Sequence, residues 1–304
     1  MRRHLEWRTW LAIAWATLRS ALDDRFTGLA AEMSFFALLG LVPLTVTFGA
    51  ALGLLWEVAD VTTVITAREL VIDVLRIVLG GELADDLAPF VRQLLGVREG
   101  GVALGGLLVS LVVGGRIFVP VIYGLDHAHR VADRRSLLVQ RLLGMALGFG
   151  SFFATGLMIA VLVLGPLLGN ARRFATQLSA GRLFEISWAI GRWPILLACL
   201  VGFLACVYRF GPSVRLSWHD VLPGTVLATT LWLAVAGGFR VYLTISGRTD
   251  VPASGSTPEA VAIVGHAVGA VIATALWVFL LSLAILLGGE LNAALLRRRA
   301  DEST

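Results

Sequence analysis

Long runs of apolar residues, separated by short polar segments, occupy most of this chain. Six runs reach the length of about 20 residues that a helix needs to cross the hydrocarbon core of a membrane. They cover residues 33–56, 102–125, 142–168, 188–208, 221–246 and 261–289. The pattern predicts an all-α, polytopic membrane protein in which six transmembrane helices form a single membrane domain over residues 1–304.

Two other segments carry apolar residues at helical spacing but no run long enough to span a membrane. In residues 5–25, arginine and aspartate interrupt a tryptophan-rich apolar face, which is typical of an interfacial helix in the headgroup layer. Residues 57–101 contain two amphipathic patterns on either side of Gly80-Gly81. They predict an extracytoplasmic helical hairpin between the first and second spans, which either caps a cavity or packs as a surface hairpin.

The composition supports a membrane location. Hydrophobic residues make up 57% of the 304 residues and charged residues only 15%, whereas soluble domains carry about 25% charged residues. The mean hydropathy is +0.83. A soluble protein of this length would need a polar surface, and the chain has too few charges to form one.

The distribution of positive charge predicts the orientation. All 25 cationic residues are arginine. With both termini in the cytoplasm, fourteen arginines lie inside, eight lie outside and three lie within spans, in agreement with the excess of positive charge in cytoplasmic loops. We therefore expect a multi-pass protein of the bacterial inner membrane. Membrane lipids are its expected partners, nucleic acid is not, and a homo-oligomer is left open.

Charged residues and prolines inside the apolar runs are the first candidates for function. An ionisable group in a bilayer is costly, so it usually faces a cavity or a partner. Arg116 lies near the middle of the second run, and Pro120 follows four residues later. Pro120 and Pro43 are candidate helix breaks, because proline removes a helical hydrogen bond. Glu32 and Glu290 are acidic candidates near the cytoplasmic boundary.

Two more arginines lie within spans. Arg192 and Arg240 are close to the outer ends of the fourth and fifth runs, where they either reach the outer headgroups or converge on Arg116. Three arginines around one cavity would suit an anionic or zwitterionic amphiphile, since guanidinium binds phosphate through two hydrogen bonds. Asn292 is a further polar candidate. His266 is either a proton-coupling group or a hydrogen-bonded core histidine.

Patterns that carry enzymatic chemistry are weak in this chain. The segment Asp126-His127-Ala128-His129 lacks the further ligands that a metal site requires, so we interpret it as part of a solvated basic loop. Ser151 lacks the sequence context of a nucleophile, and no phosphate-binding Gly-Lys-Ser/Thr loop is present. We expect no catalytic residue, no metal and no cofactor, and hence no enzyme.

Several segments, in this order along the chain, resemble the YihY/BrkB family of polytopic membrane proteins, once labelled ribonuclease BN-like. They are residues 30–38 with Pro43-Leu44, then Tyr208-Arg209 and Pro212, then Trp218, Pro223-Gly224 and Leu231-Trp232, and finally Gly288-Gly289-Glu290-Leu291-Asn292-Ala293. The last motif is the most specific. Two departures are Gly265-His266, which stands where the family has Tyr-Gly, and the segment 126–135, which matches loosely.

The resemblance implies a six-helix inner-membrane protein with both ends inside, and three functions follow from it and from the residues. The first is a transporter or flippase-like protein for an amphiphilic envelope component such as a lipid. The second is an ion-coupled solute transporter in which Glu32, His266 or Glu290 carries the proton, or in which sodium is the coupling ion. The third is a non-transporting envelope scaffold whose docking surface is residues 57–101.

Overall fold

The structure, a computed structural model, describes residues 25–55, 69, 89, 100–132, 135–169, 181–246 and 259–302. All regular structure within these ranges is helical, which confirms the all-α fold class. The six helices are α2 (Phe26–Leu55), α5 (Gly100–Ala128), α6 (Leu137–Gly169), α8 (Gly181–Phe210), α9 (Trp218–Ser246) and α10 (Glu259–Asp301). Each of the six predicted apolar runs lies within one helix, except that residue 56, the last of the first run, is outside the described residues. The predicted interfacial helix 5–25 and hairpin 57–101 lie almost entirely outside the described residues.

Five of these helices contain a stretch that is long and apolar enough to cross a membrane. The stretches are Leu108–Ala128, Leu137–Met158, Ile190–Phe210, Trp218–Tyr242 and Val271–Asp301. Side chains in α2 are described only as far as Gly40. The stretch Phe26–Gly40 is apolar but shorter than a membrane span, and the side chains of residues 41–55 lie outside the description. The chain is therefore a helical membrane protein, and the sixth span stays a prediction.

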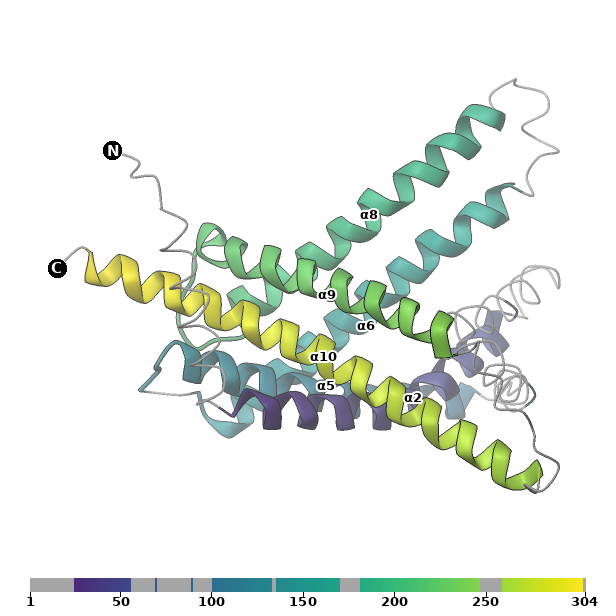
Figure 1. The fold of residues 1–304 in the computed structure, drawn as a ribbon, viewed down its shortest axis with the longest axis horizontal. Coiled ribbons are helices and arrows are strands. Elements are labelled where there is room, and N and C mark those ends of the chain that lie inside the picture. Colours follow the sequence, from purple (N-terminus) through teal and green to yellow (C-terminus); the bar gives the residue numbers. More distant parts are fainter. Residues whose placement is uncertain are drawn as a thin grey trace.

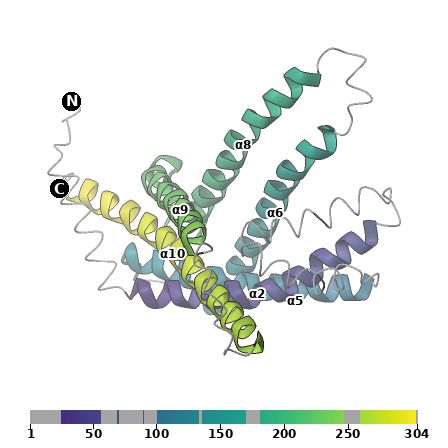
Figure 2. The same ribbon diagram turned by 45° about the vertical axis from the view of Figure 1, so that its right-hand side comes forward.

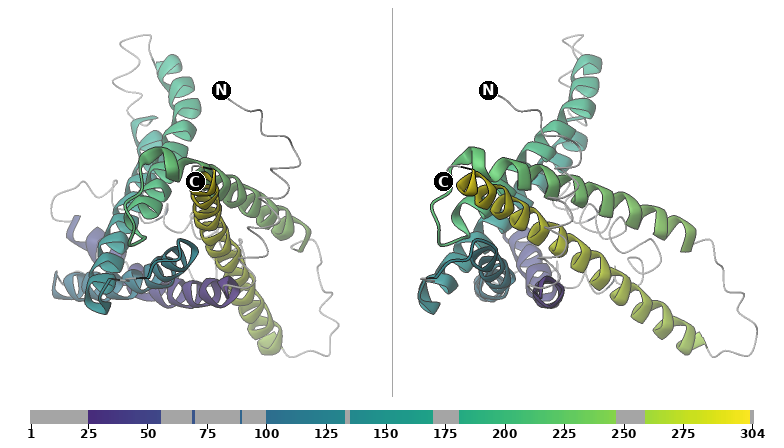
Figure 3. Two further views of the ribbon diagram at one scale, coloured as in Figure 1. Left: turned by 90° about the vertical axis from the view of Figure 1, so that its left-hand side faces the viewer. Right: turned by 60° about the vertical axis from the view of Figure 1, so that its left-hand side comes forward.

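The helices pack as a ring of antiparallel neighbours. In ring order they are α2, α5, α6, α8, α9 and α10, and α10 returns to α2 while also contacting α5. The start of α2 and the ends of α5, α8 and α10 gather at one end of the molecule, together with the start of α9 (Figure 1). We call this the convergent end. The left panel of Figure 3 faces it, with α2 and α5 along the bottom.

The helices separate toward the opposite end, which we call the splayed end. There the α6–α8 pair rises away from α2, α5 and α10 (Figures 1 and 2). Burial follows the same gradient. In α9, Val221 and Ala228 are 0% exposed near the convergent end, whereas Leu233 and Val241 are 56% and 58% exposed further along. The buried core and the closest helix contacts therefore belong to the convergent end.

Two sequence interpretations change at this level. Helix α5 continues through Pro120 without interruption, because a proline removes only one hydrogen bond and apolar packing on both sides maintains the helix. The segment that begins at Asp126 is not a solvated loop. Residues up to Ala128 belong to α5, and Asp126 is 0% exposed, since Ser213, in the connection between α8 and α9, supplies hydrogen-bond donors to its carboxylate.

Candidate functional site

Small residues let α9 and α10 approach closely at the convergent end. A methyl group built on Gly224 would collide with the carbonyl oxygen of Gly288, and one built on Gly288 would collide with the hydroxyl of Tyr208. Tyr208, from α8, is 1% exposed and donates a hydrogen bond of 2.7 Å to the carbonyl of Ile285. Three segments that carry the sequence resemblance thus meet at one point.

Asn292 joins α10 to the first turns of α9. Its Oδ1 accepts a hydrogen bond of 2.6 Å from the Gly224 N–H, and its Nδ2 donates one of 3.2 Å to the Val221 carbonyl. Pro223 lies inside this part of α9 and has no N–H to give to the helix. The buried amide therefore satisfies backbone groups beside the proline.

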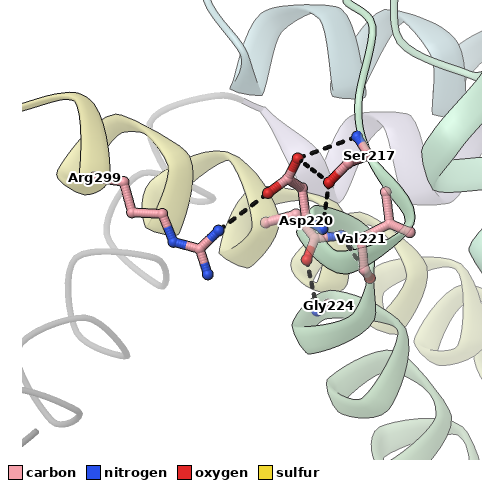
Figure 4. Close-up of polar contacts among 6 residues, drawn as sticks. Ser217, Asp220, Val221, Gly224 and Arg299 are labelled. Carbon is pink, nitrogen blue, oxygen red and sulfur yellow. Dashed lines mark hydrogen bonds and ion pairs between the residues drawn. The ribbon is translucent and has the colours of Figure 1, made fainter. Parts of the chain in front are cut away.

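The start of α9 is fixed by a capping box, shown in Figure 4. Ser217 precedes the helix, and the carboxylate of Asp220 accepts hydrogen bonds from the Ser217 N–H at 3.1 Å and from its hydroxyl at 2.5 Å. The other Asp220 oxygen lies 3.0 Å from Arg299 of α10. The local sequence Ser-x-x-Asp is typical of this motif. The ion pair with Arg299 connects the motif to α10.

The end of α5 turns in a Schellman motif. Arg130 adopts the left-handed conformation, with a φ of 52°. Its N–H donates to the His127 carbonyl, and the Val131 N–H donates to the Asp126 carbonyl. The turn places His129 beside α10. It also directs the Asp126 carboxylate at the α8–α9 connection, where it accepts hydrogen bonds from Ser213.

Glu290 is, with Asp126, one of two fully buried acids of the described chain at this end. Its side chain is 0% exposed, and its Oε1 lies 2.7 Å from a guanidinium nitrogen of Arg297, two turns further along α10. Arg297 also donates a hydrogen bond to the carbonyl of Ala128, the last residue of α5. The Oε2 atom of Glu290 is buried and has no hydrogen-bond partner.

His129 has one engaged and one unengaged ring nitrogen. Its Nδ1 lies 2.8 Å from the Leu125 carbonyl oxygen, which can only accept, so Nδ1 carries the proton and Nε2 is an acceptor in the neutral ring. The Nε2 atom is buried without a partner. Burial lowers the pKa of His129 below 6.5, and the nearby Arg297 charge lowers it further, against the Leu125 hydrogen bond and the Glu290 charge.

Arg116 lies on an exposed face of α5, with Val112 and Tyr123. It is about 18 Å along the helix from the last residue of α5, and hence near the middle of the span Leu108–Ala128. Its guanidinium stands 5.8 Å from the centre of the Phe36 ring of α2. No carboxylate of the described chain pairs with it. Pro120 lacks the N–H that would otherwise bond to the Arg116 carbonyl.

The other two intramembrane arginines lie further toward the splayed end. Arg192 of α8 is half-buried, stands 5.4 Å from the Trp193 ring and has a buried Nε without a partner. Arg240 of α9 is exposed. No described contact joins either of them to Arg116. A cavity shared by the three arginines stays a prediction.

The remaining candidates are apart from the convergent cluster or lie outside the description. Glu32 is exposed on α2. Pro43 and His266 occupy positions in α2 and α10 whose side chains are not described. No group of three or more His, Cys, Asp and Glu side chains in the described ranges is arranged to hold a metal ion.

Sequence reasoning missed Arg297 and His129 as charged neighbours of Glu290, and Asp126 as the buried partner of Ser213. Arg297 was counted only toward topology, although its seven-residue spacing from Glu290 places the two on one helical face. The other two were read as loop residues. Helix periodicity carried past Leu125 would have placed Asp126 on the same buried face as Ile122 and Leu125.

The comparisons with known proteins agree with the sequence resemblance. A family model described as virulence factor BrkB matches residues 17–304. The chain is also similar to a ribonuclease-like protein, YfkH, of Bacillus subtilis (strain 168), with 28% identity over 210 residues that cover 68% of this chain and 70% of that protein. No solved structure matches the chain. The matched region contains every motif on which the resemblance rests.

Proposed function

The chain belongs to the BrkB family of membrane proteins, and from this premise we propose that it moves an amphiphilic component of the cell envelope, such as a lipid, across or within the bacterial inner membrane. The observation that carries the proposal is the exposed guanidinium of Arg116 near the middle of an apolar span. A charge at this depth requires a counterion. A phosphate-bearing headgroup meets that need through two hydrogen bonds.

The surroundings of Arg116 favour an amphiphile over a small polar solute. Its described neighbour is the aromatic ring of Phe36, and the flanking Val109 and Val112 are exposed and apolar. An acyl chain can lie on such a face while its headgroup binds the guanidinium. Arg192, half-buried with an unpartnered Nε, offers a second position for an anionic group closer to the splayed end.

Orientation is part of the proposal. The convergent end carries Arg297, Arg298 and Arg299 at the end of α10, and the positive-inside rule assigns such a cluster to the cytoplasm. The molecule is then closed toward the cytoplasm and separated toward the outer leaflet. Labelling in intact cells of a cysteine introduced at Glu302, in a chain whose Cys199 and Cys206 are replaced by serine, tests this. Labelling by a membrane-impermeant thiol reagent before lysis would contradict the orientation.

Lipid movement is tested with the full chain in vesicles of phosphatidylethanolamine and phosphatidylglycerol that contain a trace of fluorescent lipid. Chemical quenching of the outer leaflet reports the rate of transbilayer movement. We expect the wild-type chain to accelerate movement over empty vesicles, and Arg116→Gln to lower that rate about tenfold, which corresponds to about 1.4 kcal/mol for one lost headgroup contact. Arg116→Lys keeps the charge but loses the paired hydrogen bonds, so an intermediate rate is expected.

The matched control is Arg215→Gln, because Arg215 is exposed in the α8–α9 connection outside the spans. Its rate should equal the wild-type rate. Wild-type vesicles no faster than empty ones, or equal rates for Arg116→Gln and wild type, would refute the proposal. Proton- or sodium-driven uptake of a small solute without lipid movement would instead favour the ion-coupled alternative.

The proposal includes no enzymatic step. The relative YfkH is named ribonuclease-like, and that description is said of YfkH. In the described part of this chain, the buried acid Glu290 is paired with Arg297 and the buried acid Asp126 with Ser213. Both carboxylates are thus engaged in contacts that join one segment of the fold to another or brace α10, which supports a structural role.

A further inference from the structure

Helices α2 and α5 lie side by side (Figure 3) and form one exposed surface with a charge on each helix. On α2, Glu32 is exposed, and Phe36 follows one turn later on the same side of the helix. On α5, Arg116 is exposed, and its guanidinium stands 5.8 Å from the centre of the Phe36 ring. Phe36 therefore connects the two charges to one surface, which we call the α2–α5 face.

The antiparallel helices are aligned by contacts at two levels. A methyl group built on either of two glycines would touch the facing helix, at the pairs Gly40–Val113 and Gly124–Leu29. Between these levels, Glu32 lies opposite a point on α5 that is five residues from Arg116, which is about 7.5 Å along the helix. Among the described residues, neither charge has an ion-pair partner. The carboxylate thus lies closer to the convergent end than the guanidinium, without a direct contact between them.

Beyond Arg116, toward the splayed end, the α2–α5 face is apolar. Val112 and Val109 share the side of α5 that carries Arg116, and Leu39 shares the side of α2 that carries Glu32. All three are exposed. From the convergent end outward, the face therefore presents an acid, then a base, then apolar side chains.

This order is that of a phospholipid with an ammonium group in the cytoplasmic leaflet. In such a lipid the ammonium lies outermost, the phosphate lies below it and the acyl chains lie deepest. With the convergent end in the cytoplasm, Glu32 is the outermost group of the face and Arg116 is the deeper one. An anionic lipid alone would have no use for the acid.

We propose that the α2–α5 face binds a zwitterionic phospholipid that carries a primary ammonium group. The phosphate binds Arg116, the ammonium binds Glu32, and an acyl chain lies on the apolar side chains beyond. An oxygen and two methylene groups separate phosphorus from nitrogen in such a headgroup, so one lipid can bridge two charges that do not touch. The proposal rests on the proposed function, whose substrate class it names.

Glu32 is the residue that selects the headgroup. A primary ammonium donates charge-assisted hydrogen bonds to a carboxylate. The quaternary ammonium of a choline headgroup has no N–H to donate, and a glycerol headgroup has no positive charge. The phosphate is common to all three lipids, so Arg116 binds each of them.

Phe36 positions the guanidinium of Arg116 rather than the lipid. A cation over a ring is attracted to its face, whereas the N–H donors of a guanidinium lie in its own plane. The contact with Phe36 therefore leaves donors of Arg116 available for the two hydrogen bonds that a phosphate accepts.

Photo-crosslinking of the full chain tests the site. Vesicles of phosphatidylcholine contain a trace of phosphatidylethanolamine or phosphatidylglycerol, each with the same photoactivatable group on an acyl chain, and mass spectrometry measures the labelled fraction and the labelled residues. We expect labels near Val109 and Val112. Phosphatidylethanolamine should label the wild-type chain about fivefold more than phosphatidylglycerol, the upper range for one exposed charge contact.

The variants separate the two charges. Glu32→Gln should lower labelling by phosphatidylethanolamine to that by phosphatidylglycerol, and Glu32→Arg should reverse the preference. Arg116→Gln should lower labelling by both lipids. The matched control is Asp301→Asn, which removes an exposed carboxylate at the end of α10 and should keep the wild-type preference.

Equal labelling of the wild-type chain by the two lipids overturns the proposal, as does a preference that persists in Glu32→Gln or Glu32→Arg. Labelling requires binding but no transbilayer movement. The expected preference in a chain that moves no lipid would keep the binding site and reject only the proposed transport. Lipid movement that depends on Arg116 without a headgroup preference would keep the transport and reject this lipid class.

Discussion

Asp126 at the end of α5 binds Ser213 in the connection between α8 and α9 through both carboxylate oxygens. One oxygen accepts from the Ser213 N–H at 2.6 Å, and the other accepts from the Ser213 hydroxyl at 2.9 Å. The two residues are far apart in sequence, and the segment of Asp126 was interpreted from the sequence as a solvated loop. Their contact anchors the α8–α9 connection on the buried end of α5.

Replacing Asp126 should therefore destabilise the convergent end. Hydrogen bonds to a charged group contribute about 1.5–3 kcal/mol each, so Asp126→Ala should lower the free energy of unfolding by about 3 kcal/mol or more. Ser213→Ala removes only the hydroxyl contact and should cost about half as much. Denaturant titration of the detergent-solubilised chain measures both, with Asp301→Ala on the exposed end of α10 as the control. Equal stability of Asp126→Ala and Asp301→Ala would contradict the prediction.

A second prediction follows from the close approach of α9 and α10. A methyl group at Gly288 meets Tyr208 and the carbonyl of Gly224, so Gly288→Ala must push the helices apart. Overpacking of this kind costs about 1–3 kcal/mol. At Gly237, further along α9, nothing lies within 4 Å of an added methyl group. Gly237→Ala should stay within about 1 kcal/mol of the wild-type unfolding free energy, and a loss as large as that of Gly288→Ala would argue against the helix contact.

The sequence was sufficient to predict the helices because their apolar runs exceed the length that a membrane requires. It was not sufficient to place them relative to one another. Gly114 and Gly115 look equivalent in sequence, yet a methyl group at Gly115 collides with Met145 of α6 while one at Gly114 meets nothing. Which of two adjacent glycines faces a neighbour depends on helix rotation, and the apolar pattern is too uniform around each helix to define that rotation.

The candidate site at the convergent end could be predicted only in part, because its contacts also depend on how the helices are placed relative to one another. Glu290 and Asn292 were both candidates from the sequence, and in the structure Asn292 binds the backbone of α9 whereas Glu290 binds Arg297. Periodicity within one helix indicates that the two point in different directions. His129, whose pKa the Glu290 charge affects, lies just after the end of another helix, and no local pattern links it to Glu290.

Asn292 supplies a third prediction, because its two amide atoms have opposite roles. Asn292→Ala removes both hydrogen bonds of the buried amide, which contribute about 0.5–1.5 kcal/mol each. Asn292→Asp keeps an acceptor for Gly224 but sets a second acceptor against the Val221 carbonyl, so it should not restore stability. The same denaturant titration compares the two variants. Wild-type stability in Asn292→Asp would show that only the Gly224 contact matters.

The stability of Glu290→Gln should depend on pH more steeply than that of the wild type. Burial lowers the pKa of His129 below 6.5, and the Glu290 charge opposes this effect, so removing the charge lowers the pKa further. The unfolded chain then binds the histidine proton more readily than the folded chain. Stability is fully present above about pH 6.5 and is lost as the pH falls below it, by at most about 1.4 kcal/mol per pH unit.

The measurement is the unfolding free energy of three chains at about pH 7.5 and about pH 5.5, which lie on either side of the ordinary histidine pKa. The loss on acidification should be larger in Glu290→Gln than in the wild type. It should shrink again when His129→Gln is added, because the group that binds the proton on unfolding is gone. A double variant that loses as much stability as Glu290→Gln would assign the pH dependence to a group other than His129.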